Sequence, residues 1–456
     1  MGMLRTTHLP DPGTACLYVL LTAIFAVAAL IPDVLLPLLG AAAAFGLVFA
    51  AWRHLIGFSV AWLLFAGTSL EMTLHDLIDP TAYGATIAAV KAAQLGLAAL
   101  CALRYGPRWD ADNPAWAYLL IFAIGLLHGL HPGLRAADSL RSLAGSVAPF
   151  AFCFCRTPRD WAGAIIRATR WIPLLSVVGG ATLDIAGLRP LFVNSGGMRL
   201  VGLGHPAFLA GVCLAAVYAC LIRLYRGGGR ADLALLGVNF VILTLTGARA
   251  PLAYGVAVTT LALAFIPAPC LPARRRWLLL LGVAALLPAL ALLDPALSDI
   301  RVFNLLATDS TDLSGRDLLW PPFEHAADQS YWFGWGLGAG NFIIPPEGQV
   351  AKLLQTWAAH NEYLRMEVEG GQIGRGLLVA SFVLWALRHT RRLPRAERRI
   401  MRLVFIAFAA HAFTDNVLIS TPASVLFSFV AAVFAGETSA TAAARPSGLP
   451  KDAALA

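Results

Sequence analysis

Apolar segments of close to 20 residues recur along almost the whole chain, separated by short polar turns. A helix of that length crosses a hydrocarbon core of about 30 Å. A helix also satisfies every backbone hydrogen-bonding group inside lipid. The composition agrees, because 58% of the residues are hydrophobic and only 13% are charged. The sequence therefore predicts an all-α polytopic membrane protein.

The boundaries of the apolar segments predict a bundle of about 12–14 transmembrane helices. Two segments, 55–70 and 142–155, are short enough to be re-entrant or merged with a neighbour, which explains the range. The predicted spans are 14–31, 34–51, 55–70, 83–103, 114–131, 142–155, 170–187, 205–224, 232–247, 251–268, 276–293, 374–389, 400–416 and 421–435.

The basic residues predict how the bundle is oriented. If the N-terminus faces the cytoplasm, most of the 34 Lys and Arg residues fall in cytoplasmic connections, as the positive-inside rule requires. The chain then has four parts: a transmembrane bundle (1–293), a large helical loop on the outer face (294–373), C-terminal transmembrane helices (374–435) and a disordered inner tail (436–456). A loop as long as 294–373 is usually functional.

Charge and cysteine usage exclude several other classes of protein. The net charge of +8 is not accompanied by a nucleic-acid-binding module, so we expect no nucleic-acid partner. Nearly all of the seven cysteines lie in apolar runs, where they are small core residues and not a disulfide framework or a zinc site.

Arginines at the outer ends of predicted spans are candidates for anion binding. Arg249 lies between two apolar spans with almost no loop, so it must snorkel, pair with an acid or bind an anion. Arg135, Arg141 and Arg199 lie at other outer span ends. The planar guanidinium binds phosphate through two parallel hydrogen bonds. A structural ion pair or snorkelling explains each of these residues equally well when it is taken alone.

The run AAHNEYLRMEVEGGQIGRG is the most polar helix-like stretch of the chain and ends the large loop. His360 is either a catalytic base or an interfacial histidine. Asn361 is also a good helix cap, and Gly371 and Gly374 also suit a break before the next span. The glutamates of this run are most simply a solvated helix face. A metal site is not predicted, because no second histidine follows at the spacing of a metal motif.

The pattern His360-Asn361, nine residues, then Gly371-x-x-Gly374, placed just before a transmembrane helix, resembles the signature of bacterial O-antigen ligases and the related O-antigen polymerases. The order of further elements across about 130–430 agrees with that resemblance, whereas 1–110 carries no usable motif. Those elements are GLGHPAFLAG (202–211), TGAR (246–249), SGRDLLW (314–320) with Arg316, GWGLGAGNF and the late acid Asp415.

The resemblance implies a membrane glycosyltransferase with a lipid-accessible periplasmic cavity, in the bacterial inner membrane. The loop 294–373 would then be periplasmic and the tail 436–456 cytoplasmic. Such enzymes transfer a glycan from undecaprenyl diphosphate to lipid A–core, in ligases, or to another lipid-linked glycan, in polymerases. The implied partners are thus a lipid-linked glycan donor, a glycan acceptor and membrane lipid, with no cofactor and no metal.

The chemistry of that transfer suggests a role for each candidate. A diphosphate leaving group needs charge stabilisation, for which we expect Arg249, Arg199, Arg135 and Arg141. An acceptor hydroxyl needs a base, for which we expect His360, on a helix that begins near this residue.

Two further side chains have supporting roles in this interpretation. We expect Arg316 to contact the donor phosphate or acids of the loop, and Asp415 to orient His360 or an arginine. Asn361, Gly371 and Gly374 support the motif, and the glycines let the loop helix turn into the next span. The expected reaction inverts the anomeric carbon without a metal.

Other functions stay open on the sequence alone. An O-antigen or exopolysaccharide polymerase and a protein O-oligosaccharyltransferase would use the same donor. A flippase or transporter of the lipid-linked glycan would suit Lys91 inside a predicted span and the polar break at 202–206. A structural or sensory membrane protein would have no use for the histidine and glycine signature.

Overall fold

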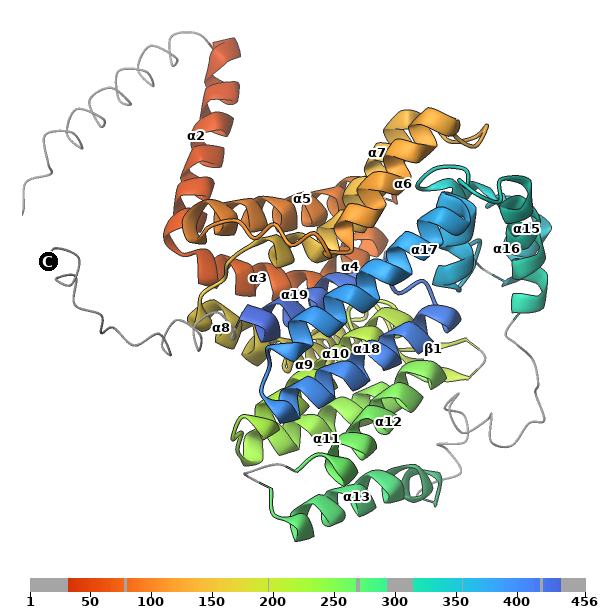
Figure 1. The fold of residues 1–456 in the computed structure, drawn as a ribbon. Coiled ribbons are helices and arrows are strands. Elements are labelled where there is room, and N and C mark those ends of the chain that lie inside the picture. The colour runs from red at the N-terminus through yellow and green to blue at the C-terminus, as the bar shows by residue number, and fades with distance from the viewer. Residues whose placement is uncertain are drawn as a thin grey trace, which may run out of the picture. The chain divides into compact units, whose positions relative to one another are not determined.

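The computed structural model describes residues 32–77, 80–195, 197–267, 271–292, 315–354, 356–418 and 421–435. The chain divides into two units, Met1–Phe58 and Ser59–Ala456. The described part of the first unit contains α2 (Pro32–Arg53), a 22-residue apolar helix, and the first turn of α3 (Leu55–Thr68). Everything below concerns the second unit, which is drawn with its helices labelled in Figure 1.

The second unit is built almost wholly of helices, and the all-α polytopic prediction is confirmed (Figure 1). After α3 its helices are α4 (Leu70–Leu77), α5 (Pro80–Tyr105), α6 (Ala115–His128), α7 (Ala136–Val147), η1 (Ala148–Phe154), α8 (Arg159–Thr169), α9 (Ile172–Ile185), α10 (Pro206–Tyr225), α11 (Arg230–Leu245), α12 (Arg249–Phe265), α13 (Ala273–Leu292), α15 (Arg316–Gln329), η3 (Ala339–Phe342), α16 (Gln349–Leu354), α17 (Glu362–Arg391), α18 (Arg395–Thr414) and α19 (Thr421–Ala435).

Every predicted span from 34–51 onward coincides with helical structure, whereas 14–31 lies outside the described residues. By length and hydropathy, three described helices can cross a membrane: Thr86–Tyr105, Pro206–Tyr225 and Glu362–Arg391. A fourth is added if Ala43–Arg53 and Leu55–Thr68 count as one span, and others, such as α6 and α12, are shorter apolar helices. The total of 12–14 spans stays a prediction.

The centre of this unit is α10, which is buried on nearly all sides. A helix that is apolar all round belongs in the interior. Its small residues, among them Ala215, Ala216 and Ala219, let neighbouring helices approach closely. α10 packs against α11, α12, α18 and α19, as well as α8 and α9. It therefore ties the C-terminal helices to the middle of the chain.

The only described strands form one β-hairpin, β1 (Phe192–Asn194) with β2 (Met198–Leu200), just before α10. The strands are antiparallel, and Val193 pairs with Arg199. The hairpin was not predicted, because two strands of three residues are too short to show an alternating pattern. Its consequence for the site is that Arg199 is held on a strand beside the start of α10.

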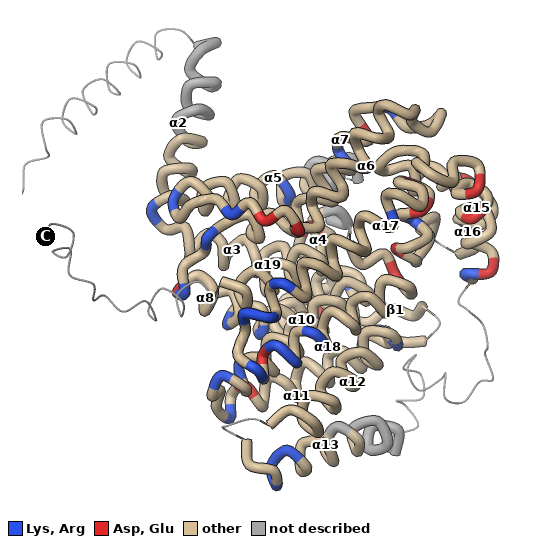
Figure 2. The backbone as a smooth tube through the Cα atoms, viewed as in Figure 1, with Lys and Arg blue, Asp and Glu red and all other residues tan. Residues whose placement is uncertain are grey.

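The two ends of the helices differ in their charges. An ion pair of 2.7 Å between Arg226 and Glu397 joins the end of α10 to the start of α18, so two arginine-rich connections lie side by side. His205 begins α10 at the opposite end, about 30 Å away for a helix of this length. Figure 2 shows basic residues around α8, α11 and α18 and acidic ones around α15 and α17. The connections predicted to face the cytoplasm thus gather at one end.

Residues 316–360, which we call the cap, share a hydrophobic core with the start of α17 and with Leu134. Leu319 and Phe323 of α15 are buried against Ala351 of α16 and against Leu364 and Val368 at the start of α17. This packing stabilises a segment that contains many loops, since a buried side chain of this size contributes about 1.5–3 kcal/mol. It also fixes the cap on the first turns of α17.

A glycine kink shapes α17, the helix that joins the cap to the predicted span 374–389. Gly371 has φ +61° and ψ −166°, a conformation open almost only to glycine. Gly334 of the cap, with φ +70°, crosses it so closely that a Cβ on either residue would lie about 2.5 Å or less from backbone atoms of the other segment. Of the two glycines predicted to let the helix turn, Gly371 forms the kink, whereas Gly374 keeps helical backbone and lies against Ile121.

Segment 331–336 of the cap replaces the helical hydrogen bonds that the kink interrupts. A broken helix leaves backbone N–H and C=O groups that must find other partners. These partners are backbone groups of the cap, at 2.8–3.2 Å: Trp335 N to Val368 O, Gly336 N to Glu369 O, Gln372 N to Tyr331 O and Ile373 N to Trp332 O. The Gly-rich motifs of the cap and of α17 therefore form one backbone contact.

We predict that Gly371→Ala prevents this contact. The added Cβ would lie 2.3 Å from the Trp332 carbonyl, and the backbone conformation alone would cost about 1–3 kcal/mol. Gly376→Ala is the matched control, because Gly376 has open space around it and helical backbone, where alanine is favoured. Thermal unfolding of the purified variants should show a large loss for Gly371→Ala alone. Equal melting temperatures for the two variants would refute the contact.

Candidate active site

His360 lies in the turn between α16 and α17, not on the helix itself. The helix was expected to begin near His360 and to carry it; it begins two residues later, at Glu362, and the side-chain oxygen of Asn361 caps it, accepting from Tyr363 N (3.1 Å) and Leu364 N (3.2 Å). His360 has a φ of +46°, which is uncommon for a residue other than glycine. Such conformations cluster at functional sites. The cap of α17 thus holds the imidazole outside the helix.

The structure brings His360 and Asp415 together. His360 Nδ1 lies 3.0 Å from Asp415 Oδ1, which also accepts from Asn416 N at 2.8 Å. A carboxylate can only accept, so Nδ1 carries the proton and Nε2 has a free lone pair. The Thr356 hydroxyl lies 3.0 Å from Nε2 and donates to it. Asp415 therefore fixes the tautomer in which Nε2 can act as a base.

His360 and Asp415 line a cavity of about 300 Å³. Its polar end also contains His205, His411 and Asn416. From Ala207 to Tyr218 the cavity then follows α10 for about 17 Å, at 1.5 Å per residue. The remaining lining residues are mostly apolar: Phe208, Gly211, Leu214, Ala215, Ala358, Phe408, Val417, Pro422, Ala423 and Leu426. A polar end that continues into an apolar passage suits an amphiphilic ligand.

Arg316 lies beside this pair, at the start of α15. Its Nη2 donates to the backbone carbonyl of Thr414 at 2.7 Å, at the C-terminus of α18. A cation at this end of a helix is favoured by the helix dipole. Its buried Nε has no hydrogen-bond partner among the described residues. Arg316 therefore adjoins Asp415, but its described contact is the backbone of α18 and not an acid of the loop.

Arg199 and Arg249 meet at one turn. Arg199 Nε on β2 donates to the Thr246 carbonyl at 2.9 Å, and Arg249 is the exposed first residue of α12, three positions further on. The hairpin therefore brings two of the predicted phosphate-binding arginines to the α11–α12 connection. Neither of them is among the residues that line the cavity.

Arg135 and Arg141 lie elsewhere, at the start and along the exposed face of α7. Arg135 pairs with Asp138 at 2.8 Å, and 82% of its side chain is exposed. Neither arginine lines the cavity of His360. The structure does not place these two arginines near Arg199, Arg249 or Arg316. The contact that Arg135 makes is a surface ion pair.

Two glutamates of the polar run are buried, contrary to the solvated face expected from the sequence. Glu362 and Glu369 are 2% and 1% exposed and both bind Arg365, with 2.9 Å between Arg365 and Glu369. Glu367 instead pairs with Arg375 at 2.7 Å. Breaking a buried ion pair costs about 3–5 kcal/mol, since the remaining charge is left in a dry environment. These ion pairs hold α17 in place.

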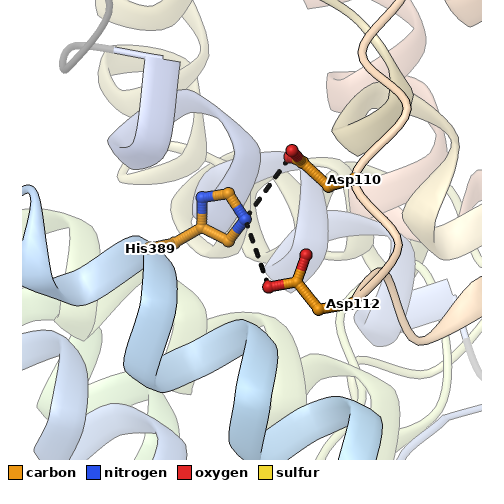
Figure 3. A group of neighbouring side chains, drawn as sticks. All are labelled: Asp110, Asp112 and His389. Atoms are coloured by element: carbon orange, nitrogen blue, oxygen red, sulfur yellow. Dashed lines mark ion pairs between the residues drawn. The ribbon is translucent and has the colours of Figure 1, made fainter.

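The described residues include one group that could hold a metal ion: Asp110, Asp112 and His389, whose ligand atoms lie within 4.8 Å of one another. Figure 3 shows both carboxylates facing the same ring nitrogen of His389, with Nε2 3.4 Å from Asp110 and 4.0 Å from Asp112. The group lies at the far end of α17 from His360, so it belongs to a different part of the protein.

The hydrogen bonds of this group do not suit a metal. Arg108 donates to His389 Nδ1 at 2.7 Å, and a guanidinium cannot accept. Nε2 must therefore keep its proton in the neutral ring, which removes the lone pair a metal needs. The carboxylates are already paired, Asp110 with Arg108 and Asp112 with Arg388. We assign this group as a charge-balanced structural cluster.

Sequence reasoning missed the other histidines of the cavity, His205 and His411. His205 stands in the motif GLGHPAFLAG, directly before a proline and an apolar run. A polar residue followed by proline is typical of a helix N-cap and first position, and this signal could have placed the ring at the outer end of α10. His411 carries no such signal, because it lies within the amphipathic α18.

Comparison with known families matches residues 233–379 to the family described as O-Antigen ligase. The matched stretch includes Arg249, Arg316, His360 and both glycines of the signature. The chain therefore carries an O-antigen ligase family domain, and the resemblance inferred from the motifs is confirmed. The comparison with curated proteins found no match.

The matched domain supports a function of the O-antigen ligase and polymerase type in general. Members of this family are enzymes of the glycosyltransferase type that act on lipid-linked glycans, and the apolar helices of this chain agree with a membrane protein.

Proposed function

We propose that the protein is an O-antigen ligase-type glycosyltransferase. It transfers a glycan from undecaprenyl diphosphate to a sugar hydroxyl of lipid A–core, at the periplasmic face of the bacterial inner membrane. The observation that carries the proposal is the His360–Asp415 pair at the polar end of a cavity that continues along the apolar α10. A glycan on a long lipid has the same division into polar and apolar parts.

The proposed reaction is a single displacement. The acceptor oxygen attacks the anomeric carbon and forms the new C–O bond, while the bond from that carbon to the diphosphate oxygen breaks. The bonding electrons leave with undecaprenyl diphosphate, and the hydroxyl proton passes to His360 Nε2. Asp415 stabilises the imidazolium that forms. Attack on the face opposite the leaving group inverts the configuration.

Arginines take the place of a metal in this proposal. The diphosphate gains negative charge as it leaves, and preorganised positive groups stabilise that charge most strongly away from bulk water. Arg199 and Arg249, at one turn, and Arg316, with its unpartnered Nε, are the best-placed candidates. Arg135 and Arg141 would act on the donor only at a distance from the cavity.

The Thr356 hydroxyl supports the assignment of His360 as the base. It donates to Nε2 at 3.0 Å, the position that an acceptor hydroxyl must take before it loses its proton. The acceptor would therefore displace this hydroxyl. An O-antigen or exopolysaccharide polymerase would use the same arrangement with a lipid-linked glycan as its acceptor.

We predict that the purified protein transfers the glycan of an undecaprenyl-diphosphate donor to lipid A–core in a buffer containing EDTA. A shift of the core band on a gel measures ligation, and a ladder on undecaprenyl diphosphate would instead indicate a polymerase. Loss of activity in EDTA that one metal restores would contradict the metal-independent mechanism. No transfer to either acceptor would contradict the proposed function.

We predict that His360→Ala and His360→Gln both lose about 10²–10⁴-fold in turnover, because neither side chain can accept the proton. His325→Gln is the control, since His325 is an exposed histidine on α15 of the same cap. All variants should reach the membrane at wild-type levels and still bind the donor. If His360→Gln retains the wild-type turnover, His360 only positions the substrate.

We predict that Arg249→Lys loses most of its activity although it keeps the charge. Lysine cannot form the two parallel hydrogen bonds that a guanidinium makes with phosphate. Arg230→Lys is the matched control, because Arg230 is the exposed first residue of α11. The connection to α12, where Arg249 lies, follows the other end of α11. Initial rates over a range of donor concentrations measure the difference. Wild-type rates for Arg249→Lys would reduce Arg249 to a snorkelling anchor.

A further inference from the structure

His205 is a second imidazole in the cavity of His360 and Asp415. It is the N-cap of α10, and its Nδ1 accepts a hydrogen bond from Ala207 N at 3.3 Å. Among the described residues no group accepts a hydrogen bond from its Nε2. The ring thus uses one nitrogen to cap the helix, and no described residue accepts from the other.

The loop that carries His205 is held unusually firmly. Arg189 donates to the backbone carbonyls of Leu203 and Gly204, each at 2.7 Å. The Ser176 hydroxyl accepts from Leu203 N at 3.1 Å. Arginine and serine side chains from two other segments therefore fix the two residues directly before His205. This immobility is what a preorganised binding group requires.

The partners of the two histidines give them opposite properties. Because His205 Nδ1 accepts from a backbone N–H, the proton of the neutral ring is on Nε2, which can only donate. A ring whose Nδ1 accepts a hydrogen bond carries no proton on that nitrogen and is neutral. In His360 the proton is on Nδ1, and Nε2 accepts. One cavity thus presents a fixed donor and a fixed acceptor.

We propose that His205 Nε2–H donates a hydrogen bond to a diphosphate oxygen of the lipid-linked donor. This inference rests on the proposed function. The charged groups near His205 are two guanidinium groups, of Arg199 and Arg189, and one carboxylate, of Asp415, so positive charge is in excess and favours an anionic ligand. A neutral donor keeps this hydrogen bond without competing with His360 for the proton of the acceptor. His205 is then a binding residue for the leaving group, and His360 the base.

Substitution by asparagine separates the two contacts of His205. Asparagine is among the best N-cap residues, so His205→Asn keeps a side-chain acceptor for the first turn of α10. Its shorter side chain does not reach the position of Nε2. The probe is undecaprenyl diphosphate, titrated into the protein in lipid nanodiscs, and undecaprenol is the control probe because it has the same chain without the diphosphate.

We predict that His205→Asn binds undecaprenyl diphosphate about 10- to 100-fold more weakly than the wild type, the usual effect of losing one hydrogen bond to a charged group. Its affinity for undecaprenol and its melting temperature should not change. His360→Gln should bind undecaprenyl diphosphate as the wild type does. If His205→Asn lowers the melting temperature, the test is repeated with His205→Ser, which is also a good cap.

Unchanged diphosphate affinity in the stable variant would overturn the inference and leave His205 as a helix cap only. An equal loss for undecaprenol would also overturn it, because the variant would then have altered the passage for the lipid chain. If the wild type itself does not bind undecaprenyl diphosphate, the proposed function fails together with the inference. These outcomes distinguish a wrong residue from a wrong reaction.

Discussion

The backbone contact between Gly334 and Gly371 is the constraint on which the outer end of the protein depends. It interrupts α17, and the cap supplies the hydrogen bonds that the helix loses there. Backbones can approach this closely only where both residues lack a Cβ and both adopt positive φ. The contact therefore joins the cap to a long apolar helix by main-chain atoms, which no change of rotamer can loosen.

The packing of the cap against the start of α17 fixes the position of His360. Ten residues separate His360 from the kink, and over this stretch Arg365 binds two buried glutamates while Leu364 and Val368 pack into the core of the cap. Asn361 then ends the helix and leaves His360 in the turn before it. The imidazole meets Asp415 from the far end of α18, so the pair forms only when both helices are in position.

Hydrogen-bond partners, more than the residue type, decide what each histidine can do. His360 faces a carboxylate, His205 faces a backbone N–H and His389 faces a guanidinium. The first partner leaves Nε2 as an acceptor, and the other two leave it as a donor. The same side chain thus suits a base, a proposed ligand of the diphosphate and a structural cluster.

The sequence by itself determined the helical membrane class and the places of the apolar helices from 34–51 onward, because long apolar runs have few alternatives in lipid. Its local signature also indicated the resemblance to O-antigen ligases. It also identified His360 and Asp415 as candidates. Tertiary structure decided that these two meet, that Arg199 contacts the α11–α12 connection just before Arg249, and that Arg135 and Arg141 lie elsewhere. Glu362 and Glu369 were expected in solvent, since their burial depends on packing of α17 against the cap. Such contacts join residues far apart in the chain, and no local pattern encodes them.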